Sequence, residues 1–572
     1  MLRGAAAVGA MTAGAGWRAG YASAADGKRV AVLGGGVAGL TAAHELAERG
    51  FEVTVYERRA LGGKARSIPV PGSATGGRPE LPGEHGFRFF PGFYQHIPDT
   101  MRRIPFGTNP DGVWNNLVAV PEARFARLDG DDFRVALDFS APTDPSKPGF
   151  AETLGAALAT ALKVSPTEGL FFANRLLVFN TSSDTRRFQQ WEYMSWLDFV
   201  RGHERSHEFR SLLSRTLTSI MVAAKDHVAS VRTIGTMGEQ FLGNPLGIGN
   251  DGALDRVLDG PTNLTWIDPW TAHLRGLGVR FALGTEVRGL EVRDRRVSGV
   301  RIIDESGTAR TLEADHVVVA LSAEQARELW SPDVLAVRPE LEGMNRLVVD
   351  WMTGIQFYLR SNPDISPGHT AYIDSPWSLT SISQNHLWAR KLGEYGDGTV
   401  RDCLSVDISD WHTPGILYGK PAMECTHEEI AREAWAQMKA HLNDRAELLR
   451  DADLHSWFLD PAIVWQAQSG RNTNADPLLI NTAGSWDLRP EPHGALENLF
   501  LAGDYVRTKV DLATMEGASE SARAAVNALL DATGSNAPRC TMYTLYRAAE
   551  LEPLRRIDAD RFAAGLPNLF DI

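Results

Sequence analysis

The chain has little cysteine: three residues among 572, at Cys403, Cys425 and Cys540. They lie far apart and form no C-x-x-C pair, so the sequence predicts neither a disulfide framework nor a metal site. Isolated cysteines of this kind are usually packing residues.

Long apolar runs and an excess of positive charge are also lacking. No uncharged apolar run reaches the roughly 18 residues that a membrane-spanning helix needs. The net charge is −13, from 58 Lys and Arg against 71 Asp and Glu, whereas proteins that bind nucleic-acid phosphates are normally basic. We therefore expect no nucleic-acid partner. The hydrophobic fraction of 43% and the charged fraction of 23% exclude a disordered or polytopic membrane protein and are ordinary for a globular enzyme.

Residues 1–27 do not resemble part of a folded domain. Residues 2–16 are small and weakly apolar, and Ala22-Ser23-Ala24 matches an A-x-A cleavage site. The segment is similar to the end of a twin-arginine export signal, except that it contains no Arg-Arg pair. Two interpretations stay open: an exported protein, or a cytoplasmic protein with a disordered Ala/Gly-rich leader.

A dinucleotide-binding motif follows this segment. Gly34, Gly36 and Gly39 form G-x-G-x-x-G between an apolar run at 30–33, which predicts a buried strand, and a helical pattern at 40–47. Gly34 would make the tight turn, Gly36 would let a pyrophosphate approach the backbone, and Gly39 would let helix and strand pack closely.

The residues around the motif complete the site. Val37 and Ala38 open the expected helix, whose free N–H groups attract phosphate. A second strand pattern at 52–56 ends at Glu57, which is placed to accept hydrogen bonds from the adenosine ribose. The same glycine pattern recurs at 247–252, but it follows Asn-Pro-Leu instead of an apolar strand, which favours an ordinary Gly-rich connection.

Further segments resemble the flavin amine oxidase and phytoene desaturase superfamily. Leu61-Gly62-Gly63-Lys64-Ala65-Arg66-Ser67 is similar to its second glycine signature, and Asn498 to Asp504 is similar to its strand that ends in Gly-Asp. The resemblance implies FAD, and no His or Cys lies at an evident flavin-linkage motif, which predicts non-covalent binding. The resemblance also implies roles for individual residues. The cofactor-binding residues that it adds to those above are Gly63, Lys64, Arg66, Val287, Gly503, Asp504, Met515 and Ala518.

The string from Glu84 to Tyr94 resembles the E-H-G-F segment of carotenoid-desaturase-like flavoproteins, which runs beside the flavin ring. This resemblance implies that Gly86 and Phe87 contact the cofactor, and it makes His85 and Arg88 candidate catalytic residues. Packing of a domain interface by the aromatic residues of this string is the alternative interpretation.

Tryptophans supply two more candidates. Trp351 and Trp486 are expected to wall the substrate pocket near the flavin, because aromatic walls suit an apolar substrate or an amine. Amine oxidases of the superfamily carry a Lys near the flavin, on the strand that enters the substrate domain. No Lys occurs between Lys225 and Lys391, which weakens the amine-oxidase interpretation.

The expected fold is α/β with two domains: a Rossmann-like FAD-binding domain interleaved with a substrate-binding domain. The FAD domain is predicted at 28–110, 245–330 and 480–532, and the substrate domain at 111–244 and 331–479. Residues 533–572 are predicted to be a C-terminal tail with a short helix near 543–551. A helix is predicted at 428–442, with Thr426 and Glu429 forming a capping box.

The sequence thus predicts an FAD-dependent oxidoreductase that takes a hydride from an apolar, isoprenoid-type substrate. A flavin amine or amino-acid oxidase that makes imine and peroxide is the alternative, and a non-catalytic flavoprotein is a third hypothesis. A single dinucleotide motif indicates reoxidation by oxygen, a quinone or another carrier. Apolar clusters at 158–162 and 170–179 are either core or the mouth of a substrate tunnel that rests on a membrane surface.

Overall fold

The computed structural model describes residues 28–86, 88–128, 131–136, 164–220, 224–243 and 253–571. The predictions for residues 1–27, for Phe87, for 158–162 and for the second glycine pattern at 247–252 lie outside these ranges. Within the described ranges, no helix has the length and hydropathy that a membrane span requires.

The first layer is a five-stranded parallel sheet with the order β10-β2-β1-β14-β24. Its members are β1 (Arg29–Leu33), β2 (Glu52–Glu57), β10 (Arg280–Leu283), β14 (His316–Val319) and β24 (Leu499–Leu501). Strands that are hundreds of residues apart in the sequence therefore pair directly. The predicted α/β fold class and the predicted strands at 30–33 and 52–56 are confirmed.

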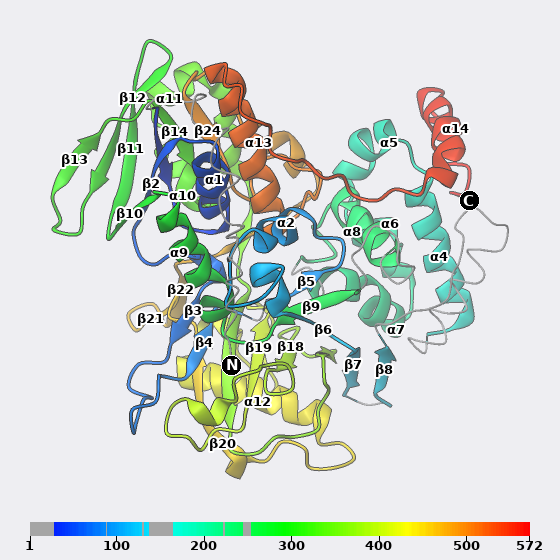
Figure 1. The fold of residues 1–572 in the computed structure, drawn as a ribbon. Helices are drawn as coiled ribbons and strands as arrows, with labels where there is room; N and C mark the ends of the chain where they lie inside the picture. Colours follow the sequence, from blue (N-terminus) through cyan, green and yellow to red (C-terminus); the bar gives the residue numbers. More distant parts are fainter. Residues whose placement is uncertain are drawn as a thin grey trace, which may run out of the picture.

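Both faces of this sheet are covered, as continuous apolar strands require. Helices α1 (Val37–Glu48) and α13 (Met515–Thr533) pack on one face, with Val30, Val53 and Phe500 in the shared core. The other face, with Ala31 and Val319, packs on an antiparallel sheet of β11 (Glu286–Arg293), β12 (Arg296–Ile303) and β13 (Ala309–Leu312). Figure 1 shows these layers at the upper left.

The second large layer is a seven-stranded mixed sheet with the order β20-β16-β19-β18-β17-β7-β8. Its strands are β7 (Glu122–Arg127), β8 (Phe133–Ala136), β16 (Thr353–Leu359), β17 (His369–Ile373), β18 (Thr380–Ser383), β19 (Asp402–Ile408) and β20 (Leu454–Leu459). One face packs on α12 (His427–Leu442) (Figure 1). The predicted capping box of α12 is confirmed, since the Thr426 hydroxyl accepts from Glu429 N and the Glu429 carboxylate accepts from Thr426 N.

A helical unit lies beside the outer strands of this sheet (Figure 1). It comprises α4 (Pro166–Asn180), α5 (Asp184–Gln189), α6 (Trp196–Phe199), α7 (His207–Phe209) and α8 (Val231–Gly243). Its core contains Phe172, Trp196 and Phe209, and it reaches Ala371 on β17.

Short elements connect these layers. They are β3 (Ser67–Pro69), β4 (Pro82–Glu84), β5 (Phe90–Pro91), α2 (His96–Arg102), β6 (Leu117–Ala119), β9 (Asp255–Leu258), α9 (Asp268–Gly276), α10 (Ala323–Ala326), α11 (Pro332–Val337), β15 (Val349–Asp350), β21 (Ile463–Gln466), β22 (Arg471–Asn474) and β23 (Leu478–Leu479).

The C-terminal tail differs from the sequence prediction. The helix expected near 543–551 is present only as a 3-10 turn at Ala549–Leu551, and the α-helix α14 follows it at Glu552–Ala563. Pro553 stands in its first turn, where a missing N–H costs no helical bond. Asp558 holds α14 against α5, because its buried carboxylate accepts from Arg186 Nε at 2.9 Å. Tertiary ion pairing therefore positions this helix, and the local apolar spacing does not.

Candidate functional site

One cavity of about 860 Å³ is lined by residues of both large sheets. Most of the sequence-predicted site residues line it, although they come from distant segments. They are Gly34, Gly36, Val37, Ala38, Glu57, Gly63, Lys64, Arg66, His85, Gly86, Arg88, Val287, Gly503, Asp504, Met515 and Ala518. Of the other predicted residues, Gly39, Trp351 and Trp486 do not line the cavity, and Phe87 is outside the described residues.

The glycines of the first motif are required for different reasons. Gly34 has a φ of +110°, and a β-carbon there would lie 2.5 Å from Ala320 O. A β-carbon on Gly39 would lie 1.9 Å from Gly34 O, so Gly39 serves helix–strand packing and has no place in the cavity wall. At Gly36 the nearest atom to an added β-carbon is Gly63 Cα at 3.8 Å. The protein itself leaves room at Gly36, which points to a ligand as the reason for a glycine there.

The start of α1 fits a phosphate. Its N-cap is Gly36, with no side-chain cap and no acidic residue in the first turn. The first N–H groups of the helix therefore face the cavity at Val37 and Ala38 without a side-chain partner at the cap. Gly62 N donates to Gly35 O at 2.8 Å, which brings the second glycine pair against the first. These residues fit the pyrophosphate of an FAD molecule.

Glu57 stands at the end of β2 and at the edge of the cavity. Its Oε2 accepts from Gly35 N at 2.8 Å and its Oε1 accepts from Arg59 N at 2.7 Å. Each carboxylate oxygen can accept more than one hydrogen bond. Glu57 therefore shapes the glycine turn and still has lone pairs for ribose hydroxyls.

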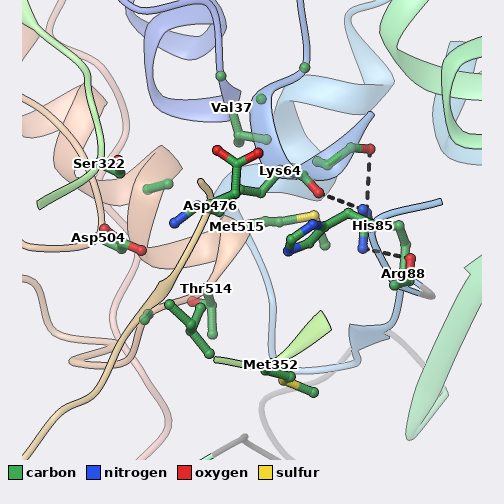
Figure 2. Close-up of a pocket in the computed structure, with 18 of the residues that line it drawn as sticks. Val37, Lys64, His85, Arg88, Ser322, Met352, Asp476, Asp504, Thr514 and Met515 are labelled. Carbon is green, nitrogen blue, oxygen red and sulfur yellow. Dashed lines mark hydrogen bonds between the residues drawn. The ribbon is translucent and has the colours of Figure 1, made fainter. Parts of the chain in front are cut away.

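The Asp504 carboxyl lies on the opposite side of the cavity from His85 and Arg88 (Figure 2). Asp504 follows Gly503, which has a φ of +136° and donates its N–H to Ser521 Oγ at 2.9 Å. Burial raises the pKa of the Asp504 carboxyl, and the charge of Lys64 opposes the rise. Lys64 Nζ donates to the Pro477 carbonyl and lies 3.6 Å from Glu324. This arrangement can bind hydroxyl and phosphate groups of a bound cofactor.

Arg88 is largely occupied by backbone carbonyls. Its guanidinium donates to Gly86 O at 2.8 Å, Lys64 O at 2.5 Å and Ala65 O at 3.3 Å. Dashed lines in Figure 2 mark these bonds. Arg88 therefore links the second glycine segment to the segment at Gly86 by hydrogen bonds. This makes Arg88 a positioning residue as well as part of the cavity wall.

His85 forms a buried pair with a residue that the sequence did not single out. Its Nδ1 hydrogen-bonds to Asp460 Oδ2, and Asp460 is almost fully buried. Burial raises the pKa of Asp460, but the hydrogen bond and charge of His85 outweigh it, so the pKa is lowered overall. The His85 ring also lines the cavity. Its orientation is therefore fixed by a carboxylate, as proton-transfer histidines commonly are.

The far end of the cavity is mainly apolar. Its wall comes from one face of the seven-stranded sheet and from α8 and neighbouring segments. The apolar members are Phe89, Phe93, Phe125, Val135, Met237, Phe241, Leu254, Met352, Ala371 and Leu512. The face of the sheet that packs on α12 is a separate core, which contains Ile355, Leu404 and Val406.

Polar residues that the sequence analysis missed interrupt this apolar wall. Asp255, His369, Thr380 and Asp407 all line the cavity. Burial raises the pKa of Asp407 to about 7, although the charges of Arg88 and His369 oppose the rise. Two carboxylates, Asp255 and Asp407, therefore lie at the substrate end of the cavity. The available signal was an acidic residue inside the apolar run 402–408, which is costly to bury without a purpose.

The two tryptophans proposed as pocket walls lie elsewhere. Trp351 packs edge-on against Trp411, with ring centroids 5.3 Å apart, at the core beneath α12. Trp486 is surrounded by cations: the guanidinium carbons of Arg232, Arg507 and Arg489 lie 4.2, 5.4 and 5.6 Å from its ring. Both rings pack against other side chains, and neither lines the cavity.

The apolar run at 170–179 is mostly core. Phe172, Leu176 and Phe179 of α4 are buried, whereas Leu170 is 43% exposed. None of these α4 residues lines the cavity, so a tunnel running to α4 is not seen among the described residues. Instead, α8 supplies the helical part of the wall through Met237 and Phe241.

One cluster has the composition of a metal site: His44, Glu48 and His273, on α1 and α9. His44 Nδ1 accepts from Trp270 Nε1 at 3.1 Å, which leaves the ring proton on Nε2, beside Glu48 at 3.1 Å. A metal at Nε2 would have to displace that proton. The geometry therefore favours a hydrogen-bonded chain from Trp270 to Glu48.

Comparisons with known proteins agree with this geometry. The model of the flavin-containing amine oxidoreductase family matches residues 37–530. The chain is 26% identical over 554 residues to the carotenoid phi-ring synthase of Streptomyces griseus, covering 93% of each protein. It is 24% identical over 533 residues to the zeta-carotene desaturase of Synechocystis, covering 88% of this chain and 97% of that one.

Solved structures show the same fold. Cyclohexylamine oxidase from Brevibacterium oxydans aligns with a TM-score of 0.58 and 16% identity, covering 89% of this chain and 99% of that one. Putrescine oxidase bound to putrescine aligns with a TM-score of 0.58 and 13% identity, covering 89% and 100%. At these identities the likeness concerns the fold alone.

Proposed function

The chain belongs to the flavin-containing amine oxidoreductase family, and from that membership we propose that it oxidises an apolar, carotenoid-type isoprenoid substrate with non-covalently bound FAD. The observation that carries the proposal is the similarity, over 93% and 88% of the chain, to proteins named for carotenoid chemistry. The mainly apolar far end of the cavity supports it, because such a wall favours a hydrocarbon chain. The electron acceptor in this proposal is oxygen, a quinone or another carrier.

When bound, FAD supplies a two-electron acceptor for a hydride from a C–H bond. The residues proposed to hold it are those of the first glycine motif, Glu57, the Gly63 segment and Asp504, together with the start of α13. Thr514 caps that helix by accepting from Gly517 N at 3.0 Å, and Met515 and Ala518 face the cavity. The positive end of α13 would favour negative charge at this place.

The remaining residues would orient the substrate and exclude water. Phe89, Phe125 and Phe241 form apolar walls that disfavour water next to the reacting bond. His85, held by Asp460, is the proposed group for moving a proton at its Nε2. Arg88 would keep the segment at Gly86 in place through its three hydrogen bonds to backbone carbonyls.

An amine oxidase is the second candidate, and the two carboxylates Asp255 and Asp407 favour it. Both carboxylates already have charged or polar neighbours in the protein, however. Asp255 pairs with His369, and Asp407 lies in the field of Arg88. A cationic amine beside Asp407 would also meet the positive charge of Arg88. Strand β16 (Thr353–Leu359) also contains no Lys.

A direct test follows the flavin spectrum of the purified holoprotein without oxygen. We expect polyene isoprenoids in detergent to bleach the visible flavin band and a panel of primary amines to leave it unchanged. Bleaching by amines, with peroxide release when air is admitted, would instead establish the second candidate.

A further inference from the structure

Three residues that line the cavity have a buried side-chain atom without a hydrogen-bond partner among the described residues. One is Glu324 Oε2, on the side of Lys64; the other two lie at the substrate end. They are Asp255 Oδ1 and Thr380 Oγ1, in residues that are only 4% and 5% exposed. Buried polar atoms are nearly always paired, so each exception calls for an explanation such as a bound ligand or water. Both residues line the cavity, so a group bound in it is a candidate partner for either atom.

The two atoms belong to one compact group, which we call the polar niche: Asp255, His369, Thr380 and Asp407. Thr380 on β18 is directly opposite Asp407 on β19 and opposite Ala371 on β17. His369 lies two residues before Ala371, on the same face of the strand. Asp255 joins from β9 through the hydrogen bond between its Oδ2 and His369 Nε2.

The niche adjoins the segment proposed to run beside the flavin. A β-carbon on Gly86 would lie 2.4 Å from Asp407 Oδ1. Phe89, three residues later, packs edge-on against the His369 ring with centroids 5.8 Å apart. A substrate that reaches the segment at Gly86 therefore passes the polar niche. The rest of the substrate contacts the apolar walls.

We propose that the substrate carries one uncharged hydroxyl group, which the polar niche binds through Asp255 and Thr380. This inference rests on the proposed function, which it narrows from a hydrocarbon to an isoprenoid alcohol. A hydroxyl both donates and accepts, so a single group has the chemistry to donate to Asp255 Oδ1 and to accept from Thr380 Oγ1. Asp407, directly across from Thr380, offers the same group a further carboxyl oxygen or proton.

Other chemical groups satisfy the niche less well. A carbonyl only accepts and leaves Asp255 Oδ1 unpaired, and a hydrocarbon leaves both atoms unpaired. An ammonium can donate to both atoms, but it would be buried near the Arg88 guanidinium, whose charge acts on Asp407. Water is the remaining alternative, because a small polar recess can hold it.

The test compares four probes with one carbon skeleton: farnesene, farnesal, farnesol and farnesylamine. Binding to the holoprotein is measured from the shift of the flavin absorption band, with no turnover required. We expect farnesol to bind at least about tenfold more tightly than farnesene, since each unpaired buried group costs about that factor. Farnesal is expected between them.

Variants assign the preference to the niche. Thr380→Val should remove most of the farnesol preference and leave farnesene binding unchanged, whereas Thr380→Ser should keep the preference. Thr353→Val is the matched control: Thr353 is buried in the same sheet on β16 but does not line the cavity. It should bind all four probes as the unaltered protein does.

Each contrary outcome has a distinct meaning. Equal binding of farnesol and farnesene, unchanged in Thr380→Val, would mean that the niche holds water only, and it would overturn the inference while the proposed function stands. Tightest binding of farnesylamine would overturn it in favour of an amine site. If no probe moves the flavin band, the apolar-substrate function fails together with the inference.

Discussion

Gly86 and Asp407 approach so closely that a β-carbon on Gly86 would lie 2.4 Å from Asp407 Oδ1. Gly354 reinforces the contact from the neighbouring strand, since a β-carbon there would lie 2.7 Å from Gly86 Cα. The cofactor-side segment and the substrate-side sheet therefore meet without intervening side chains. This contact fixes the position of a titratable carboxyl at the junction of the two parts of the cavity.

Replacing Gly86 by Ala should force the Gly86 segment away from Asp407 on β19. We expect Gly86→Ala to lower the free energy of unfolding by roughly 1–3 kcal/mol, the usual cost of overpacking, as measured by urea denaturation. Gly276→Ala is the control, because nothing lies within 4 Å of a β-carbon there. A Gly86→Ala protein as stable as the control would show that the Gly86 segment can move away from β19 without cost.

Replacing Gly36 by Val should prevent FAD binding while the protein still folds. The added side chain would occupy the open space beside Gly36, where the pyrophosphate is expected. The measurement is the ratio of flavin to protein after purification, with circular dichroism to check folding. Gly276→Val should retain its flavin. Stoichiometric FAD in Gly36→Val would mean that the phosphate site lies elsewhere.

Asp407 should make stability depend on pH. Because burial raises its folded pKa to about 7, the folded state keeps a proton that the unfolded state releases above its ordinary pKa near 3.8. The free energy of unfolding should therefore fall as pH rises between these two values. The groups that act on Asp407 are Arg88 and His369, the latter paired with Asp255.

Asp407→Asn tests this dependence, since an amide does not titrate. Between about pH 5 and about pH 7, we expect the unaltered protein to lose about 2 kcal/mol relative to Asp407→Asn, measured by urea denaturation at each pH. Asp333→Asn, an exposed position on α11, should keep the slope of the unaltered protein. Parallel pH profiles for the protein and Asp407→Asn would contradict a raised pKa.

Trp486 should matter for stability and not for the cofactor. Trp486→Leu removes the ring that faces three guanidinium groups, which should cost about 1–2 kcal/mol of unfolding free energy. The flavin spectrum and the flavin content should stay unchanged, because the ring does not line the cavity. A changed flavin spectrum would restore Trp486 as a pocket residue.

The cofactor should leave the protein when it is denatured by acid. Proposed non-covalent binding predicts that trichloroacetic acid releases all of the yellow colour into the supernatant. Colour retained in the pellet would indicate a covalent flavin link. Three buried free thiols, at Cys403, Cys425 and Cys540, provide no exposed nucleophile among the cysteines for such a link.

The backbone around the proposed cofactor site could be predicted from the sequence because its signals are local. The strand, glycine turn and helix at 30–47 are contiguous, and each glycine has a steric reason that depends mainly on its near neighbours. The positive φ of Gly34 and the close contact of Gly39 with Gly34 O agree with the roles expected from spacing alone. The capping box at Thr426 is local in the same way.

The substrate half was decided only by tertiary structure. Asp255, His369, Thr380 and Asp407 come from four strands, and no short-range pattern links them. Whether a strand residue faces the cavity or the core beneath α12 depends on sheet register, because a shift by one residue reverses the face. Trp351 and Trp486 were misplaced for a related reason: an aromatic residue records its hydrophobicity in the sequence, but the partners that cover its ring are set by the fold.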